Sequence, residues 1–279
     1  MKKVFKGFLV SVLVASLFST QASARTLTSS DVWMKVNDSN YTCAEGMCID
    51  DKDNVYVAKL MKITGNSVTI YKYNKNKTLV KSAVFSASIM GHANDMTYCS
   101  RNEKIYIATC SDSDYSVIEI DKNLKIINKY KASKFSKLGG RATGIAYSAK
   151  NDLFFLKRGD NVCAYEISHT AINFVSDTTI SKGKYTSYVY QGIAVDDKYM
   201  YVPLSSQDSI NSVIKVFNIK KNNGKYEFTN HQLLSHNDPS MAYFEIESID
   251  FGSDNYMKFM INGGYSMNDS YDQIYRISK

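Results

Sequence analysis

Short runs in which hydrophobic and polar residues alternate recur along the whole chain, each followed by turn-forming residues. β-branched and aromatic residues dominate these runs, as in segments 55–58, 105–108 and 200–203. The turns between them are rich in Asp, Asn and Lys, and no stretch shows the period of a long amphipathic helix. The pattern therefore predicts an all-β protein.

A three-residue motif opens each unit of a long internal repeat. It consists of a polar residue, then a small residue or Asp, then Met or Ile, and it precedes a strand-like run. Its second members lie at 46, 95, 144, 192 and 248, so the steps are 49, 49, 48 and 56 residues. The five copies are Glu45-Gly46-Met47, Asn94-Asp95-Met96, Thr143-Gly144-Ile145, Gln191-Gly192-Ile193 and Glu247-Ser248-Ile249.

Four short antiparallel strands in each unit of this length are typical of a β-propeller blade. The sequence predicts a five-bladed β-propeller, with blades that start near 45, 94, 143, 191 and 247. The last unit lacks a fourth strand, and segment 30–36 can supply it, which would join both ends of the chain and remove an exposed sheet edge. A two-sheet sandwich is the alternative fold, but it does not explain the even steps.

This blade pattern resembles that of secreted bacterial propellers, and it is loosely similar to the NHL and lactonase-like propellers. The resemblance covers residues 25–279, which we expect to form a single domain. It implies a fold and does not imply an activity.

Residues 1–24 are predicted to be a secretory signal peptide, with three lysines, an apolar stretch over 8–18 and a small-x-small cleavage site ending at Ala24. We therefore expect an exported protein, either periplasmic or secreted, with no membrane span. Cleavage would leave 31 basic and 27 acidic residues, a net charge of +4. Because the lysines are scattered among acids, we expect no nucleic-acid partner. The oligomeric state is left open.

The five cysteines of the exported chain show no zinc-binding spacing. In an oxidising compartment the sequence allows two local disulfides, Cys43–Cys48 and Cys99–Cys110. The odd number leaves at least one thiol unpaired.

In a propeller the first strand of each blade lines the central channel, so the motif predicts a ring of polar side chains at one mouth. Three further polar residues, His92, Arg141 and Glu245, each lie two positions before a member of this ring and are expected at the same mouth. Tyr190 directly precedes the ring member Gln191. The predicted ligand-binding residues are Glu45, His92, Asn94, Arg141, Thr143, Tyr190, Gln191, Glu245 and Glu247. Asp95 is offset by one position, and we expect its side chain to point into the blade.

The first hypothesis is a binding module whose channel mouth takes a glycan or another cell-surface polymer, with Tyr98, Tyr147 and Tyr190 as candidate stacking residues. The second is a glycoside hydrolase or lyase in which Glu45 and Glu247 act as general acid and base, because ring closure makes their blades neighbours. The third is a protein-interaction scaffold that uses its loops. A structural role for the ring, with side chains bonded to backbone groups, is the alternative to all three.

No cofactor is predicted. Calcium is the one metal that the oxygen-rich ring could accept, although no EF-hand loop is present.

Overall fold

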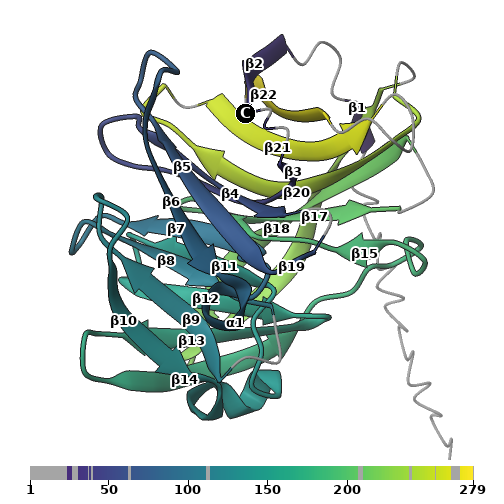
Figure 1. Cartoon of the computed structure of the whole chain (residues 1–279). Coiled ribbons are helices and arrows are strands. Elements are labelled where there is room, and N and C mark those ends of the chain that lie inside the picture. The colour runs from purple at the N-terminus through teal and green to yellow at the C-terminus, as the bar shows by residue number, and fades with distance from the viewer. Residues whose placement is uncertain are drawn as a thin grey trace, which may run out of the picture.

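A computed structural model describes residues 24–26, 31–36, 38, 40–61, 64–110, 114–206, 210–238, 241–254, 256–264 and 271–278. The strands form five sheets arranged around a centre, which confirms the predicted all-β five-bladed propeller (Figure 1). The signal-peptide prediction falls mainly on residues 1–23, which lie outside the described residues.

The first three blades are four-stranded antiparallel meanders. Blade 1 contains β3 (Tyr41–Ile49), β4 (Val55–Met61), β5 (Ser67–Tyr73) and β6 (Leu79–Ser86), followed by the short helix α1 (Ala87–Met90). Blade 2 contains β7 (Asp95–Cys99), β8 (Lys104–Ala108), β9 (Tyr115–Ile120) and β10 (Ile126–Lys131), followed by the 3-10 helix η1 (Ala132–Leu138). Blade 3 contains β11 (Gly144–Ser148), β12 (Leu153–Arg158), β13 (Asn161–Ile167) and β14 (Ile172–Thr179).

Blade 4 has a broken inner strand and a long outer hairpin. Its strands are β15 (Val189–Tyr190), β16 (Ala194–Val195), β17 (Tyr199–Ser205), β18 (Asn211–Asn222) and β19 (Lys225–Asn237), with β1 (Ala24–Thr26) parallel to β19. The hairpin strands are 12 and 13 residues long, whereas β9 and β10 have 6 residues each. This extra length accounts for the one long step of the repeat.

Blade 5 contains β20 (Tyr243–Phe251), β21 (Tyr256–Gly264) and β22 (Tyr271–Ser278). Its outer strand is β2 (Asp31–Lys35), which pairs antiparallel with β22, so the chain closes the ring as the sequence predicted. Figure 1 shows this closure directly, because purple β2 lies beside yellow β22.

Local turn chemistry explains why the first two strands of each blade form hairpins. Asp50 accepts hydrogen bonds from the backbone amides of Lys52 and Asn54, both at 2.9 Å, and so closes the turn before β4. Asp53, with φ of 58°, and Asp152, with φ of 50°, adopt the left-handed conformation in such turns, which Asp tolerates better than most residues.

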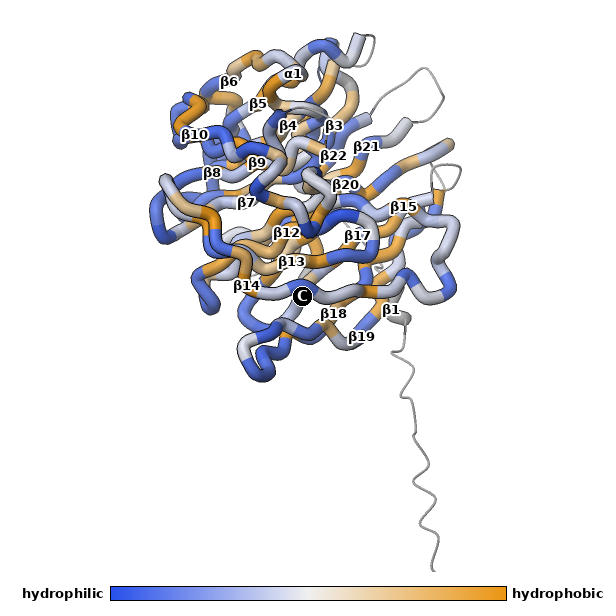
Figure 2. Tube along the Cα trace, turned by 90° about the horizontal axis from the view of Figure 1, so that it is seen from below, coloured by the Kyte–Doolittle hydropathy of each residue, from blue (hydrophilic) through white to orange (hydrophobic). Residues whose placement is uncertain are grey.

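The core lies between blades, in five hydrophobic clusters that each draw residues from two consecutive blades. Between blades 2 and 3, Phe154 packs on Tyr106 and Tyr147, with ring centroids 4.5 and 5.1 Å apart. Figure 2 shows the same division, with hydrophobic segments along interior strands such as β12 and β13 and hydrophilic ones at peripheral turns. Each blade is therefore stabilised chiefly by its two neighbours.

The cysteine prediction was wrong for both pairs, because Cys48, Cys99 and Cys110 are free thiols. Cys43 and Cys48 lie on one strand, five positions apart, which corresponds to about 16 Å of extended chain. Cys99 ends β7, whereas Cys110 follows β8 at the opposite end of that hairpin. A disulfide needs Cα atoms within about 7 Å.

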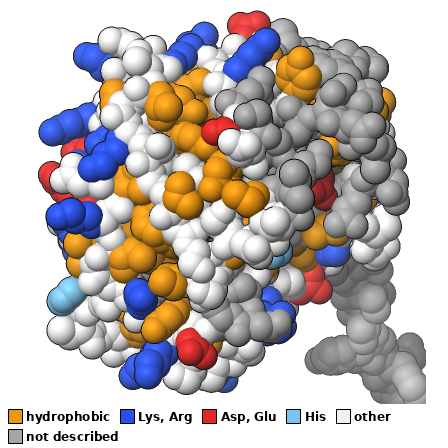
Figure 3. Space-filling model, viewed as in Figure 1, with side chains coloured by type: hydrophobic (Ala, Val, Ile, Leu, Met, Phe, Trp, Pro, Cys, Tyr) orange, Lys and Arg blue, Asp and Glu red, His pale blue; other side chains and the backbone are white. Residues whose placement is uncertain are grey.

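The outer surface carries scattered charges. On the face shown in Figure 3, Lys and Arg side chains lie singly around hydrophobic ones. The outer strand β6 exposes Leu79, Val80 and Val84, whose exposed fractions are 49%, 53% and 62%. No helix within the described residues is long and apolar enough to cross a membrane.

Candidate functional site

The inner strands β3, β7, β11, β16 and β20 run in the same direction around the axis, so the channel has two chemically different mouths. We call the end at Glu45, Asn94, Thr143, Gln191 and Glu247 the front mouth. We call the end at Asp50, Tyr98, Tyr147, Asp196 and Asp250 the back mouth.

Asp95 closes the channel between the two mouths. Its Oδ2 accepts hydrogen bonds from the backbone amides of Ile145 and Ile193, both at 2.8 Å, and its Oδ1 lies 2.8 Å from the Ser248 hydroxyl. One carboxyl group thus links blade 2 to blades 3, 4 and 5. The expectation that Asp95 points into its blade was wrong, because the unpaired amides of the inner strand edges need an acceptor at the axis.

Glycines at the equivalent positions make room for the Asp95 carboxyl group and for the backbone beside it. A Cβ on Gly192 would lie 2.6 Å from Asp95 Oδ1, and a Cβ on Gly46 would lie 2.6 Å from the Ala93 carbonyl oxygen. Burial raises the pKa of Asp95 to about 7, and the hydrogen bonds that it accepts act in the opposite direction.

Two predicted ring residues, Asn94 and Thr143, form side-chain hydrogen bonds to backbone groups. Asn94 donates from Nδ2 to the Thr143 carbonyl at 3.3 Å, and the Thr143 hydroxyl donates to the Lys157 carbonyl at 3.1 Å. Asn94 and Gln191 are each only 8% exposed. These contacts match the structural alternative for this part of the ring, and a ligand-binding role for Asn94, Thr143 and Gln191 stays a prediction.

Three glutamates gather on the opposite side of the front mouth. Glu247 is 3% exposed and hydrogen-bonds to Glu245, two positions earlier on the same face of β20, while Glu45 comes from the adjacent blade 1. Burial, together with the charges of Glu245 and Asp272, raises the pKa of Glu45 to about 8. Burial and the neighbouring Glu45 and Glu245 raise the pKa of Glu247 as well.

β-bulges place two of these glutamates. The pairing of β3 with β4 shifts between Ala44 and Gly46, and the pairing of β20 with β21 shifts between Ile246 and Ser248, so Glu45 and Glu247 are the inserted residues. A bulge redirects the side chain of its extra residue. Within the described part of the chain, neither carboxyl group accepts a backbone hydrogen bond, and one oxygen of Glu245 is buried without a partner.

A buried ion pair between Lys59 and Asp272 lies close enough to the glutamates for Asp272 to affect their pKa values. Lys59 Nζ lies 2.7 Å from Asp272 Oδ2 and donates to the Val36 carbonyl at 2.5 Å, and both side chains are 1% exposed. The charge of Asp272 adds to the effect of burial, which is the main cause of the raised pKa values of Glu45 and Glu247.

Cationic groups lie near the front mouth on the side of blade 3. Arg141 and Lys157 both act on the pKa of Cys110, as does Glu45, although burial is what raises that pKa most. Lys157 is fully buried with its ammonium 4.3 Å from the centroid of the Tyr190 ring, and burial lowers the pKa of Lys157 to about 7. His92 is exposed at the same end.

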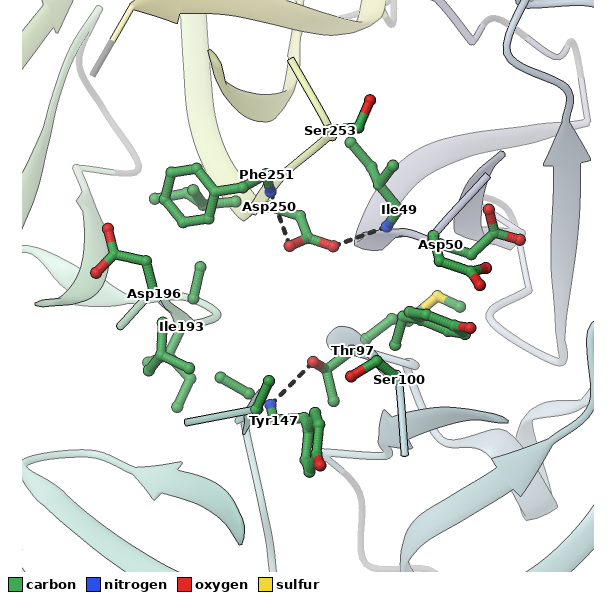
Figure 4. Close-up of a pocket in the computed structure, with 18 residues that line it drawn as sticks. Ile49, Asp50, Thr97, Ser100, Tyr147, Ile193, Asp196, Asp250, Phe251 and Ser253 are labelled. Atoms are coloured by element: carbon green, nitrogen blue, oxygen red, sulfur yellow. Dashed lines mark hydrogen bonds between the residues drawn. The ribbon is translucent and has the colours of Figure 1, made fainter. Parts of the chain in front are cut away.

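A cavity of about 290 Å³ opens at the back mouth, which sequence reasoning missed (Figure 4). Its walls include Asp50, Asp196 and Asp250 from three blades and the rings of Tyr98 and Tyr147. Two of the three tyrosines proposed as stacking partners at the front mouth therefore lie at the other end. The repeat did carry a signal, since each of these residues follows the first position of its ring motif by three to five residues.

The described residues contain no group of three or more His, Cys, Asp or Glu side chains arranged to hold a metal ion. Glu247 hydrogen-bonds to Glu245 and the pKa values of both are raised, which suits proton transfer better than chelation. Calcium binding at the ring is not proposed.

The sequence matches no protein-family model and no curated protein. Solved propellers share the fold. A GH43 glycoside hydrolase, engineered to display endo-xylanase and exo-arabinofuranosidase activity, is 8% identical with a TM-score of 0.53 over 87% of this chain and 52% of its own. An exo-β-1,3-galactanase from Phanerochaete chrysosporium, bound to β-1,3-galactotriose, is 10% identical with a TM-score of 0.53 over 90% and 64%.

A periplasmic gluconolactonase from Pseudomonas aeruginosa is also similar, at 10% identity and a TM-score of 0.46, over 84% of this chain and 70% of its own. The present chain thus spans only about half to two thirds of the two glycoside hydrolases. At these identities the likeness to the two glycoside hydrolases establishes the propeller fold alone.

Proposed function

We propose that this protein is a glycoside hydrolase whose active site is the front mouth. The observation that carries the proposal is the convergence of Glu45, Glu245 and Glu247 from two adjacent blades, with two of them aimed by β-bulges. Carboxyl groups that share protons in a buried site can supply an acid and a base at the same pH. Hydrolysis of a glycosidic bond requires such a pair.

The electrostatics divide the roles. Glu45, with a pKa of about 8, is protonated at neutral pH and serves as general acid, giving its proton to the departing glycosidic oxygen. Burial raises the pKa of Glu245, and the hydrogen bond that Glu245 accepts from Glu247 acts in the opposite direction and favours its ionised form. In an inverting reaction, Glu245 accepts a proton from the water that attacks the anomeric carbon as the glycosidic bond breaks. In a retaining reaction, Glu245 attacks that carbon itself, and a water then hydrolyses the resulting ester and gives its proton to Glu45.

A glycan substrate is favoured over other esters or peptides for two reasons. The front mouth combines carboxyl, amide and guanidinium groups that can bind hydroxyls, and two solved propellers of the same fold act on glycans. We also propose that the protein is exported, as residues 1–24 suggest, which would bring it to extracellular or periplasmic polymers.

The test is hydrolysis of defined oligosaccharides and cell-wall polysaccharides by the purified protein, with products identified by mass spectrometry. We expect new reducing ends with the native protein and a rate at least about 100-fold lower with Glu45→Gln and with Glu245→Gln. Glu166→Gln, on the exposed side of β13, is the matched control and should keep full activity. Release of no product from any glycan would refute the hydrolase.

A glycan-binding module is the second candidate, and one observation favours it. The pKa values of Glu45 and Glu247 both lie above the ordinary range, so both can donate hydrogen bonds to sugar hydroxyls without any reaction. Retention of intact glycans with no turnover, reduced in Glu45→Gln but not in Glu166→Gln, would establish that reading instead.

A further inference from the structure

The back mouth contains a second, separate cavity that the proposed hydrolase does not use. It has a volume of about 290 Å³, at the small end of ligand pockets. Asp95 and its partners Ile145, Ile193 and Ser248 lie between this cavity and the front mouth. A molecule at the back mouth would therefore not reach the glutamates.

The cavity has an apolar floor under an acidic wall. Buried side chains such as Met96, Ile193 and Ile249 form part of the floor. Four aspartates, Asp50, Asp51, Asp196 and Asp250, line the cavity, and no Lys or Arg is among its described lining residues. Figure 4 shows Asp50, Asp196 and Asp250 spaced around a central opening rather than drawn together.

Hydrogen bonds within a blade, or from the adjacent blade, hold the carboxylates apart. Asp196 Oδ1 accepts from the amides of Lys198 and Tyr199, both at 2.8 Å, and Asp250 Oδ2 accepts from the Ile49 amide at 2.7 Å. They therefore cannot converge on a small metal ion. Hydrogen bonds do not cancel their charge, so the opening favours a larger cation whose charge is spread out.

The protein already places one of its own cations beside this wall. Lys122 Nζ lies 2.9 Å from Asp51 Oδ1 and 5.1 Å from the centroid of the Tyr98 ring. An ammonium group beside a carboxylate and over an aromatic face is stabilised by both. The wall of the cavity is thus built of groups that bind a protein ammonium at its edge, and Tyr147 and Phe251 add aromatic surface inside.

We propose that the back mouth binds an organic cation, namely an ammonium group carried on a short apolar body. The apolar part would contact the floor, and the ammonium would lie among Asp50, Asp196 and Asp250. The proposal concerns a different end of the channel from the proposed hydrolase and does not depend on it.

Choline is a suitable probe, because 3,3-dimethylbutan-1-ol has nearly the same shape without the charge. Binding to the purified protein would be measured by calorimetry at low salt, with glucose and calcium chloride as further probes. We expect choline to bind at least about tenfold more tightly than the alcohol and to weaken as salt is added, because screening reduces charge attraction. Glu45→Gln should bind choline as the native protein does.

Asp196→Asn is the decisive variant, because the amide oxygen can still accept both backbone hydrogen bonds of the turn. It should weaken choline binding about threefold or more, whereas Asp177→Asn, the same charge change on exposed β14, should not. Should Asp196→Asn fail to fold, Ser100→Trp would obstruct the cavity from its exposed rim and should abolish binding. Equal affinity for choline and the alcohol, binding of glucose or calcium instead, or no binding at all would overturn the proposal.

Discussion

Replacing Asp95 by Ala should show how strongly one buried carboxyl group holds the five blades together. Asp95 is 0% exposed, and it accepts two backbone hydrogen bonds from different blades while contacting Ser248 of a third. In Asp95→Ala the amides of Ile145 and Ile193 lose their acceptor at the axis. Each buried amide left without a partner costs about 1–3 kcal/mol, so we expect a loss of about 2–6 kcal/mol of unfolding free energy.

Asp95→Asn separates the hydrogen bonds from the charge. The Asn oxygen can accept from both amides and its NH₂ group can donate to the Ser248 oxygen, so all three contacts are retained. At pH 5, where the native carboxyl group is already neutral in the folded chain, we expect the Asn variant to be within about 1 kcal/mol of the native protein.

The pH dependence of the unfolding free energy measures the effect of the Asp95 charge separately from its hydrogen bonds. Between the ordinary pKa of 3.8 and the folded value of about 7, the folded chain keeps a proton on Asp95 that the unfolded chain has lost. The native protein should therefore lose stability as pH rises through this range, by about 4 kcal/mol from this group, and Asp95→Asn should not. At pH 8 the Asn variant should be the more stable of the two.

Urea unfolding, followed by circular dichroism and by the fluorescence of Trp33, the one tryptophan of the chain, would measure these differences from pH 4 to 8. A loss below 1 kcal/mol in Asp95→Ala would show that Asp95 does not link the blades. Equal pH slopes for the native protein and Asp95→Asn would show that the carboxyl group titrates normally.

Three further predictions concern buried groups elsewhere in the ring. Burial lowers the pKa of His236 to about 4, so between pH 6.5 and 4 the unfolded chain binds a proton that the folded chain does not bind. Acidification over this range should therefore cost about 3 kcal/mol of unfolding free energy, measured by urea titration. His236→Phe should not show this loss. Gly192→Ala should lower the melting temperature in the native background and much less in Asp95→Ala, because its Cβ would lie against the Asp95 carboxyl; equal effects in both backgrounds would contradict this contact. Lys59→Met should destabilise by about 3–5 kcal/mol in urea unfolding, because it leaves Asp272 buried without its ion-pair partner, and an unchanged midpoint would disprove it.

The repeat predicted the fold because blade packing imposes the same demand on every unit. Each inner strand must pass close to its neighbours, which selects small residues at Gly46, Gly144 and Gly192, and each hairpin needs a turn former such as Asp50. These demands appear in the sequence at fixed spacing. Closure by β2 was also predictable, because one strand was missing from the last unit and one was spare before the first.

The site was only partly predictable, because bulges and side-chain directions leave no periodic trace. Glu45 and Glu247 were recognised as neighbours from ring closure, but the register shifts that aim them, and the hydrogen bond from Glu247 to Glu245, depend on pairing geometry. The repeat marked Asp95 as an exception to a small position. The repeat does not show that this one large side chain occupies the axis, where the other four blades contribute only Gly or Ser.

The proposed catalytic roles make a definite prediction for the pH profile of hydrolysis. A general acid works only while protonated, so kcat/KM should fall as pH rises through about 8, the pKa of Glu45, whereas an unperturbed glutamate would lose its proton near 4.5. The fall of kcat/KM at alkaline pH reports the pKa of Glu45 in the free enzyme, because kcat/KM is measured at substrate concentrations where little substrate is bound. A profile that declines above pH 5 would mean that Glu45 is ionised at neutral pH and cannot be the acid. Because Glu245 raises that pKa by its charge, Glu245→Gln should also move the titration of Glu45, followed by NMR of the labelled side chain, toward lower pH.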